Sequence, residues 1–138
     1  MFSIALPDNH DCGTALARIN LNWKKVREQY IYMAEFWCSI KDRLELEDTE
    51  FCFEKSSLTL NGTVLGKPFR IRIEPTGTPH GKCFIEGGYP DAPKPIGTFF
   101  LDRDGNAYND EGERIIDVGT SSAPNWVLLC NVLLTVIG

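Results

Sequence analysis

The sequence predicts an α+β domain in which a long N-terminal helix and a buried C-terminal helix flank an antiparallel β-meander of about five strands. Three observations support this fold class. A helical apolar pattern fills the first third of the chain, strand-like runs separated by turn sequences fill the middle, and an apolar segment follows a proline near the C-terminus. The 138 residues suit one domain, which we assign to residues 1–138.

The N-terminal helix is predicted over Asn22–Leu46, a stretch without glycine or proline. Asn22 is a suitable N-cap, and a shorter helical turn is expected before it over Thr14–Ile19. Such a stripe also suits a coiled coil, but beside a β-rich remainder we expect it to pack on a sheet. The apolar residues alternate spacings of three and four and therefore share one side of the helix: Trp23, Val26, Tyr30, Met33, Trp37, Ile40 and Leu44.

Strand-like runs and turns alternate through the middle of the chain. In residues 67–74, apolar and charged residues alternate strictly, which predicts a sheet with one buried and one solvent-facing side. Arg70 and Arg72 are expected on the solvent-facing side. Turn sequences such as Asp104-Gly105 separate the later runs. Further strands are expected over 51–55, 58–65, 82–86, 97–102, 106–108 and 113–118.

The C-terminal helix is expected to begin near Pro124, since proline suits the first turn and Ser121 and Ser122 suit the cap region. The residues that follow are apolar on almost every side. Such a helix must be buried on most sides, either by the sheet and the first helix or by a partner chain.

The charge balance excludes some classes of partner. The net charge is −5, and 14 lysines and arginines are scattered among 19 acids. The densest basic cluster, formed by Lys67, Arg70 and Arg72, is too small to follow a phosphate backbone, so we expect no nucleic-acid partner. Acidic lipid surfaces are disfavoured for the same reason. The longest apolar stretch, Trp126–Ile137, is too short to span a bilayer.

The cysteines and the N-terminus indicate a cytoplasmic protein. No basic region precedes an apolar one at the N-terminus, as a secretory signal would require. The five cysteines are widely spaced, odd in number and free of C-x-x-C pairs, which suits reduced thiols.

Few residues offer chemistry, because the chain has only two histidines, His10 and His80. The best nucleophile candidate is Cys83, whose thiol pKa a nearby His80 and Lys82 would lower. The competing interpretation is that Cys83 begins a short strand and points into the core.

Residues Asp102–Glu113 match the acidic positions of a calcium loop but carry Ala107 where that loop requires glycine. The flanking segments read as strands and not as helices. We therefore expect two tight acidic turns, and neither a metal nor a cofactor.

One segment resembles a known family. Tyr89-Pro90-Asp91-Ala92-Pro93-Lys94-Pro95 is similar to the Tyr-Pro-x-x-Pro-Pro segment that follows the third strand of ubiquitin-conjugating enzymes. The similarity covers about residues 89–136 and depends on the order of its motifs. Gly97–Leu101 resembles the fourth strand, and the remaining matches are Gly112, Ile116-Asp117-Val118, Trp126 and residues 132–135.

The resemblance implies a variant without the catalytic cysteine. Ile115 stands where that family keeps its nucleophile, and the upstream His-Pro-Asn motif is absent near Asn106. Such variants bind ubiquitin-like proteins or partner enzymes and form no thioester. The first helix is longer than the family's, and residues 75–88 would be an insertion.

These features predict a non-catalytic protein-binding domain, with Arg70, Arg72, Tyr89 and Ile115 as candidate binding residues. One alternative is a small acidic immunity protein or secretion chaperone that binds one dedicated partner. The other alternative is a cysteine enzyme that uses Cys83 and His80. The sequence leaves the oligomeric state open.

Overall fold

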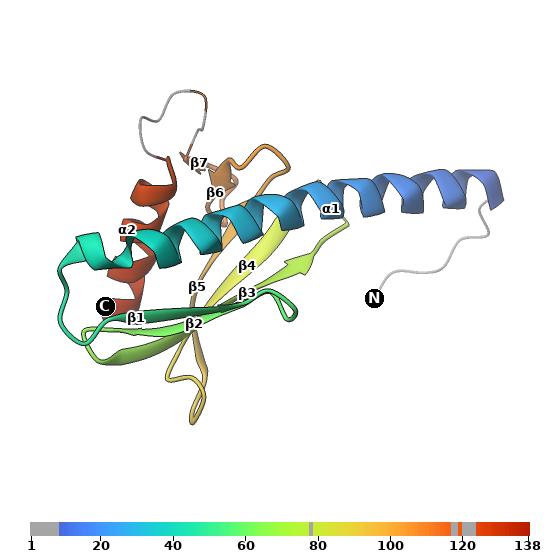
Figure 1. Cartoon of the computed structure of the whole chain (residues 1–138). Coiled ribbons are helices and arrows are strands. Elements are labelled where there is room, and N and C mark those ends of the chain that lie inside the picture. Colours follow the sequence, from blue (N-terminus) through green and yellow to red (C-terminus); the bar gives the residue numbers. More distant parts are fainter. Residues whose placement is uncertain (1–8, 78, 117–118, 120–123) are drawn as a thin grey trace.

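The computed structural model describes residues 9–77, 79–116, 119 and 124–138, with side chains from residue 12 onward. Within them, two α-helices pack on one side of an antiparallel sheet of seven strands (Figure 1). The strands follow one another in chain order from β1 to β7. The predicted α+β class, with a helix at each end of a meander, is confirmed. The sheet has seven strands instead of about five because two short strands extend it.

The bounds of the elements agree closely with the predicted runs, apart from the start of the first helix. The helices are α1 (Asn9–Ile40), the 3₁₀ helix η1 (Lys41–Leu44) and α2 (Pro124–Ile137). The strands are β1 (Glu50–Glu54), β2 (Thr59–Val64), β3 (Lys67–Pro75), β4 (Gly81–Gly87), β5 (Lys94–Leu101), β6 (Ala107–Tyr108) and β7 (Arg114–Ile116).

Helix α1 begins before Asn22, so the predicted N-cap and the separate turn over Thr14–Ile19 are both wrong. A growing helix gains one hydrogen bond per residue, and neither Gly13 nor Asn22 costs more than about 1 kcal/mol, so the helix runs through both. The same apolar spacing also continues backward from Trp23 through Ile19 and Leu16. These first turns project beyond the sheet (Figure 1), and the side chains from Cys12 to Leu21 are exposed.

The core forms between the apolar stripe of α1 and the face of the sheet that carries Phe69, Ile71 and Ile73, as predicted. Trp37 and Tyr30 are fully buried in it. The Trp37 indole Nε1–H donates to the carbonyl of Asn125 on α2 at 2.8 Å. The Tyr30 hydroxyl donates to the carbonyl of Ile71 on β3 at 3.0 Å. We call this face of the sheet the inner face.

Helix α2 begins at Pro124, as predicted, and Ser121 and Ser122 lie outside the described residues. It buries one face in the shared core: Leu128, Leu129, Val132, Leu133 and Val136. The expectation that it is buried on most sides is too strong, since Leu134 is 67% exposed and Val127 is exposed as well. Neither helix in the described part of the chain has the length and apolar composition of a membrane span.

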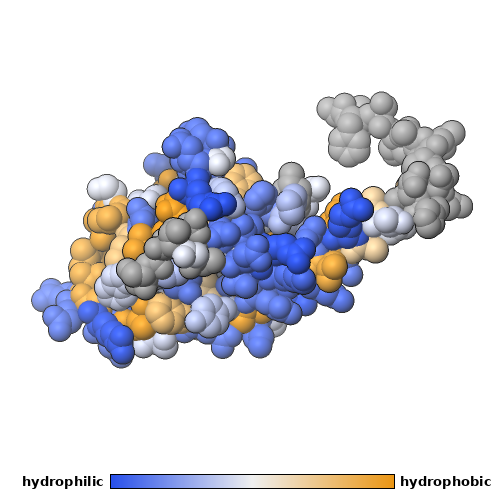
Figure 2. Space-filling model, turned by 90° about the horizontal axis from the view of Figure 1, so that it is seen from above, coloured by the Kyte–Doolittle hydropathy of each residue, from blue (hydrophilic) through white to orange (hydrophobic). Residues whose placement is uncertain are grey.

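The side of the molecule on which α1 lies carries both hydrophilic and hydrophobic residues. Seen from above, hydrophilic residues cover much of its middle, and hydrophobic residues gather at the end where α2 lies (Figure 2). Tyr32 and Leu134 are among the exposed hydrophobic side chains of the two helices. Because α1 and α2 both pack on the inner face, neither helix covers the opposite face of the sheet.

We expect Trp37→Ala to lower the free energy of unfolding by about 3–5 kcal/mol, because the change leaves a large cavity and an unpaired carbonyl at Asn125. Chemical denaturation followed by circular dichroism measures the loss. Tyr32→Ala, on the exposed side of the same helix, is the control and should cost less than about 1 kcal/mol. Equal unfolding midpoints for the two variants would contradict this assignment of the core.

Candidate functional site

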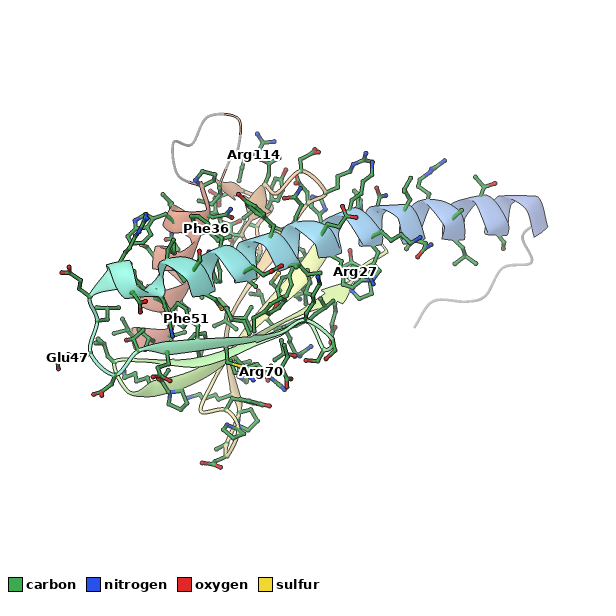
Figure 3. All side chains as sticks on the ribbon, in the orientation of Figure 1. Arg27, Phe36, Glu47, Phe51, Arg70 and Arg114 are labelled. Carbon is green, nitrogen blue, oxygen red and sulfur yellow. The ribbon has the colours of Figure 1, made fainter. Side chains whose placement is uncertain are left out.

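The outer face of the sheet, which points away from both helices, carries a row of charged and aromatic side chains. Residues of β3, β4, β5 and β6 alternate between the two faces because strand side chains have a period of two. Figure 3 shows Arg70 on the side of the sheet that faces away from α1. We define the outer-face row as Arg70, Arg72, Lys82, Phe84, Glu86, Phe100 and Tyr108.

Glu86 holds both arginines of β3 in place. Its carboxylate accepts hydrogen bonds from Arg70 Nη2 at 2.9 and 3.1 Å and from Arg72 Nε at 2.9 Å. Arg72 also pairs with Glu74 on its own strand. Burial alone would lower the pKa of Arg72, but the hydrogen bonds that Arg72 donates to Glu86 and Glu74 outweigh it and raise that pKa. The hydrogen bonds to Glu86 fix the direction of both guanidinium groups.

Aromatic rings cover the flat sides of these cations. The guanidinium carbon Cζ of Arg70 lies 4.4 Å from the centre of the Tyr89 ring, and that of Arg72 lies 4.1 Å from the Phe84 ring. Lys82 Nζ lies 5.3 Å from the Phe84 ring and 5.7 Å from the Phe100 ring. Cation–π contacts of this kind immobilise long side chains that would otherwise move freely. The outer-face row is thus ordered before any partner arrives.

A groove of about 360 Å³ adjoins this row where β1, β2 and β3 meet Tyr89 and Pro90. Its floor includes Gly62, and Asn61 and Pro68 line it as well. The side-chain Oδ1 of Asn61 is buried and accepts no hydrogen bond from the described residues. Unpaired buried acceptors are uncommon in folded proteins.

The predicted binding residues fall into two groups. Arg70, Arg72 and Tyr89 come together on the outer face. Ile115 on β7 is 38% exposed and lines a separate cavity of about 80 Å³ beside Leu128 of α2. Tyr89 and Ile115 therefore do not share one site.

Cys83 and His80 do not form a catalytic pair. Cys83 lies on the inner face, is fully buried in the core, and has a thiol pKa that burial raises. His80 packs edge-on against the ring of Tyr108, with 5.1 Å between the ring centres, and near Phe100. Both of these rings belong to the outer face. The alternation of the strand thus separates the thiol from the imidazole, and a thiolate nucleophile is not supported by this geometry.

Residues Asp102–Glu113 form two tight turns, as predicted. The Asp102 carboxylate accepts hydrogen bonds from the backbone N–H groups of Asp104 and Asn106, from the Asn106 amide and from the Tyr108 hydroxyl. Asn109 Oδ1 likewise accepts from the backbone of Glu111 and Glu113. Both carboxylate oxygens of Asp102, the first position of the calcium pattern, are thus engaged by the protein. The described residues contain no cluster of three or more metal-binding side chains.

Several outer-face residues were missed by the sequence interpretation: Asn61, Phe84, Glu86, Phe100 and Tyr108. A signal was present for two of them. In residues 82–86, Cys83 and Ile85 alternate with Phe84 and Glu86, so an aromatic residue had to share the polar face with a carboxylate. The pairing of Arg70 with Glu86 depends on strand register, which a single strand does not reveal.

Comparison with protein-family models, with curated proteins and with solved structures gives no match. The resemblance of residues 89–136 to ubiquitin-conjugating enzymes therefore stays a prediction. In this fold, Tyr89 follows the fourth strand of the sheet, and the segment that resembles the family's fourth strand is β5. Asp117 and Val118, which belong to that resemblance, lie outside the described residues.

We expect Asp102→Asn to destabilise the fold at neutral pH by about 1–3 kcal/mol, because hydrogen bonds to a charged acceptor are replaced by weaker ones. Burial raises the pKa of Asp102, but the hydrogen bonds from Asn106 and Tyr108 outweigh it, so the folded-state pKa lies below its ordinary value. The stability from this carboxylate is therefore present above about pH 4 and is lost as the pH falls through the folded-state pKa.

Urea denaturation of the wild type and Asp102→Asn between pH 7 and pH 2 measures this difference, which should shrink as the pH falls. Asp104→Asn, at an exposed neighbour, is the control and should stay within about 0.5 kcal/mol of the wild type. A difference between wild type and Asp102→Asn that is independent of pH would refute the role of the carboxylate charge.

We expect Cys83 to be the slowest of the described cysteines to react with iodoacetamide at neutral pH, because it is buried and its thiol pKa is raised. Cys12 and Cys52 are exposed and should react first. Peptide mapping by mass spectrometry over time measures the order. Preferential labelling of Cys83 that disappears in His80→Ala would restore the cysteine-enzyme alternative.

Proposed function

We propose that this chain is a non-catalytic protein-binding domain that holds its partner against the outer face of the sheet. The observation that carries the proposal is the ordered row of arginine and aromatic side chains on a face that neither helix covers. Arginine, tyrosine and tryptophan are the residue types that most often supply binding energy at protein interfaces. Groups that are already immobilised lose less entropy when a partner binds.

The neighbouring groove is a second reason to place the binding surface on the outer face. Its walls include the rings of Tyr89 and Pro90, and its buried Asn61 oxygen lacks a donor among the described residues. A partner that inserts one side chain there would cover the Tyr89 ring and bury apolar surface of the groove.

The class of partner follows from two separate expectations. The resemblance at residues 89–136 favours a ubiquitin-like protein or an enzyme of conjugation, which the domain would bind without forming a thioester. The small size and the net charge of −5 favour the alternative, in which an immunity protein or a secretion chaperone binds one dedicated partner. Both interpretations require a protein-binding face, and they differ in the partner protein that this face would bind.

We expect Arg70→Ala to weaken partner binding about fivefold or more, because it removes the cation above Tyr89 and one of the two arginines that Glu86 holds. The measurement is a pull-down from the native host with the wild type as bait, followed by titration of the purified partner by calorimetry. Arg70→Lys keeps the charge but loses the paired hydrogen bonds and the flat stacking group, and should also weaken binding.

Thr14→Ala, on the projecting exposed part of α1, is the matched control and should bind like the wild type. Recovery of a ubiquitin-like protein or a conjugation enzyme would favour the first class of partner, and recovery of one toxin or secreted effector would favour the alternative. A partner whose affinity is unchanged by Arg70→Ala, Arg72→Ala and Tyr89→Ala would refute the outer face as the binding surface.

A further inference from the structure

Strand β1 is an open edge of the sheet. The strand order places it at one end, where it pairs with β2 alone, in an unbroken antiparallel register from Glu50 to Glu54. Among the described residues, no strand lies on its other side. Edge strands of this kind expose backbone N–H and C=O groups and are usually blocked by proline, by a bulge or by a charge that points inward. The sequence of β1, EFCFE, contains no such block, since its register is regular and Phe51 and Phe53 take the inner positions.

A groove of about 560 Å³ runs beside this edge, between β1 and α1. Helix α1 contributes Glu35, Cys38 and Ser39 to its lining, and the sheet side contributes Phe51 and Phe53. Phe51 lies between the helix and the sheet (Figure 3). Phe53 is only half-buried, with its ring 6.1 Å from that of Tyr30. An open strand edge thus adjoins a groove that holds the rings of Phe51 and Phe53 and whose rim carries Glu35, Ser39 and Lys55. A strand edge beside such a groove is an arrangement that accepts an added strand.

The pleat of β1 sets the side-chain pattern that an added strand must have. The inner positions of an antiparallel neighbour would point into the groove beside Phe51 and Phe53. Its outer positions would stand opposite Glu50, Cys52 and Glu54, all of which are exposed. Apolar residues suit the first set, and cations suit the two positions that face the glutamates.

The same charges argue against a second copy of this chain as the occupant. Antiparallel pairing of two β1 edges about Cys52 would place Glu50 of one copy opposite Glu54 of the other, twice. Like charges directly opposite each other destabilise a strand pair. Each copy also has a net charge of −5, so the electrostatic repulsion extends beyond the edge itself.

We propose that the edge of β1 and the adjoining groove bind an extended segment of a partner protein, with lysine or arginine at the two positions that face Glu50 and Glu54 and apolar residues at the positions between them that enter the groove. This site does not include the outer-face row, although Glu50, Phe51 and Cys52 of β1 also line the groove beside Tyr89. The added segment becomes an eighth strand, and its backbone pairs with the free side of β1.

A synthetic peptide tests the proposal directly. Fluorescein-labelled Gly-Ser-Lys-Val-Thr-Val-Lys-Ser-Gly, titrated with the full chain and followed by anisotropy, should bind saturably. The matched peptide with both lysines replaced by glutamate should bind about tenfold more weakly or worse. Replacing its central threonine by proline should abolish binding, because proline cannot complete the strand pairing.

A charge exchange on the protein locates the site. The double variant Glu50→Lys with Glu54→Lys should prefer the glutamate peptide over the lysine peptide. The control is Asp91→Lys with Glu111→Lys, which makes the same change in net charge at two exposed positions outside β1 and should keep the preference of the wild type. The lysine peptide should also slow the alkylation of Cys52, at the centre of β1, without slowing that of Cys12.

Three outcomes would overturn the proposal. The first is the absence of saturable binding of the lysine peptide at millimolar protein. The second is an identical preference in the two double variants, which would mean that net charge and not the edge attracts the peptide. The third is binding that leaves the alkylation rate of Cys52 unchanged.

Discussion

Trp37 and Tyr30 of α1 join elements that lie far apart in the sequence, and the rest of the structure depends on this packing. Both side chains are fully buried, and each donates one hydrogen bond to a backbone carbonyl. The acceptor lies in α2 for Trp37 and in β3 for Tyr30. A buried aromatic residue with a satisfied polar group provides a large apolar area and also a fixed direction. The two residues therefore tie α1 to β3 and to α2 and help to set how α1 lies across the sheet.

Because both helices lie on the inner face of the sheet, neither of them shields the outer face from water. The outer face must contact water while its strands still carry Phe84, Phe100 and Tyr108. Phe84 is covered by Arg72, which Glu86 fixes, and Lys82 lies close to Phe84 and Phe100. The aromatic residues are thus partly shielded without a hydrophobic layer. A surface built in this way carries residue types that protein interfaces use.

The outer-face row and the edge of β1 differ in the interaction they offer. The outer-face row presents side chains on a rigid sheet, so a folded partner with its own complementary surface suits it. The β1 edge presents backbone groups and a groove, so an extended segment suits it. The cations gather on the outer face and the acids at the edge, which keeps the two surfaces distinct although β2 separates them by a single strand.

The sequence by itself determined the class of the fold, the strand runs, the helix at Pro124 and the face of β3 that is buried, because each follows from the period of apolar residues within one segment. It also predicted the two tight turns within residues Asp102–Glu113, because glycine and acidic residues are typical of such turns. The start of α1 was missed, because helix propagation through Gly13 is a cooperative property. Only the tertiary structure decided which residues meet across strands: it joined Arg70 to Glu86 and Tyr89, placed Ile115 elsewhere, buried Cys83 away from His80, and left one edge open beside α1. Register and the relative placement of elements arise from contacts between distant segments, and these contacts leave no periodic trace in any one of them.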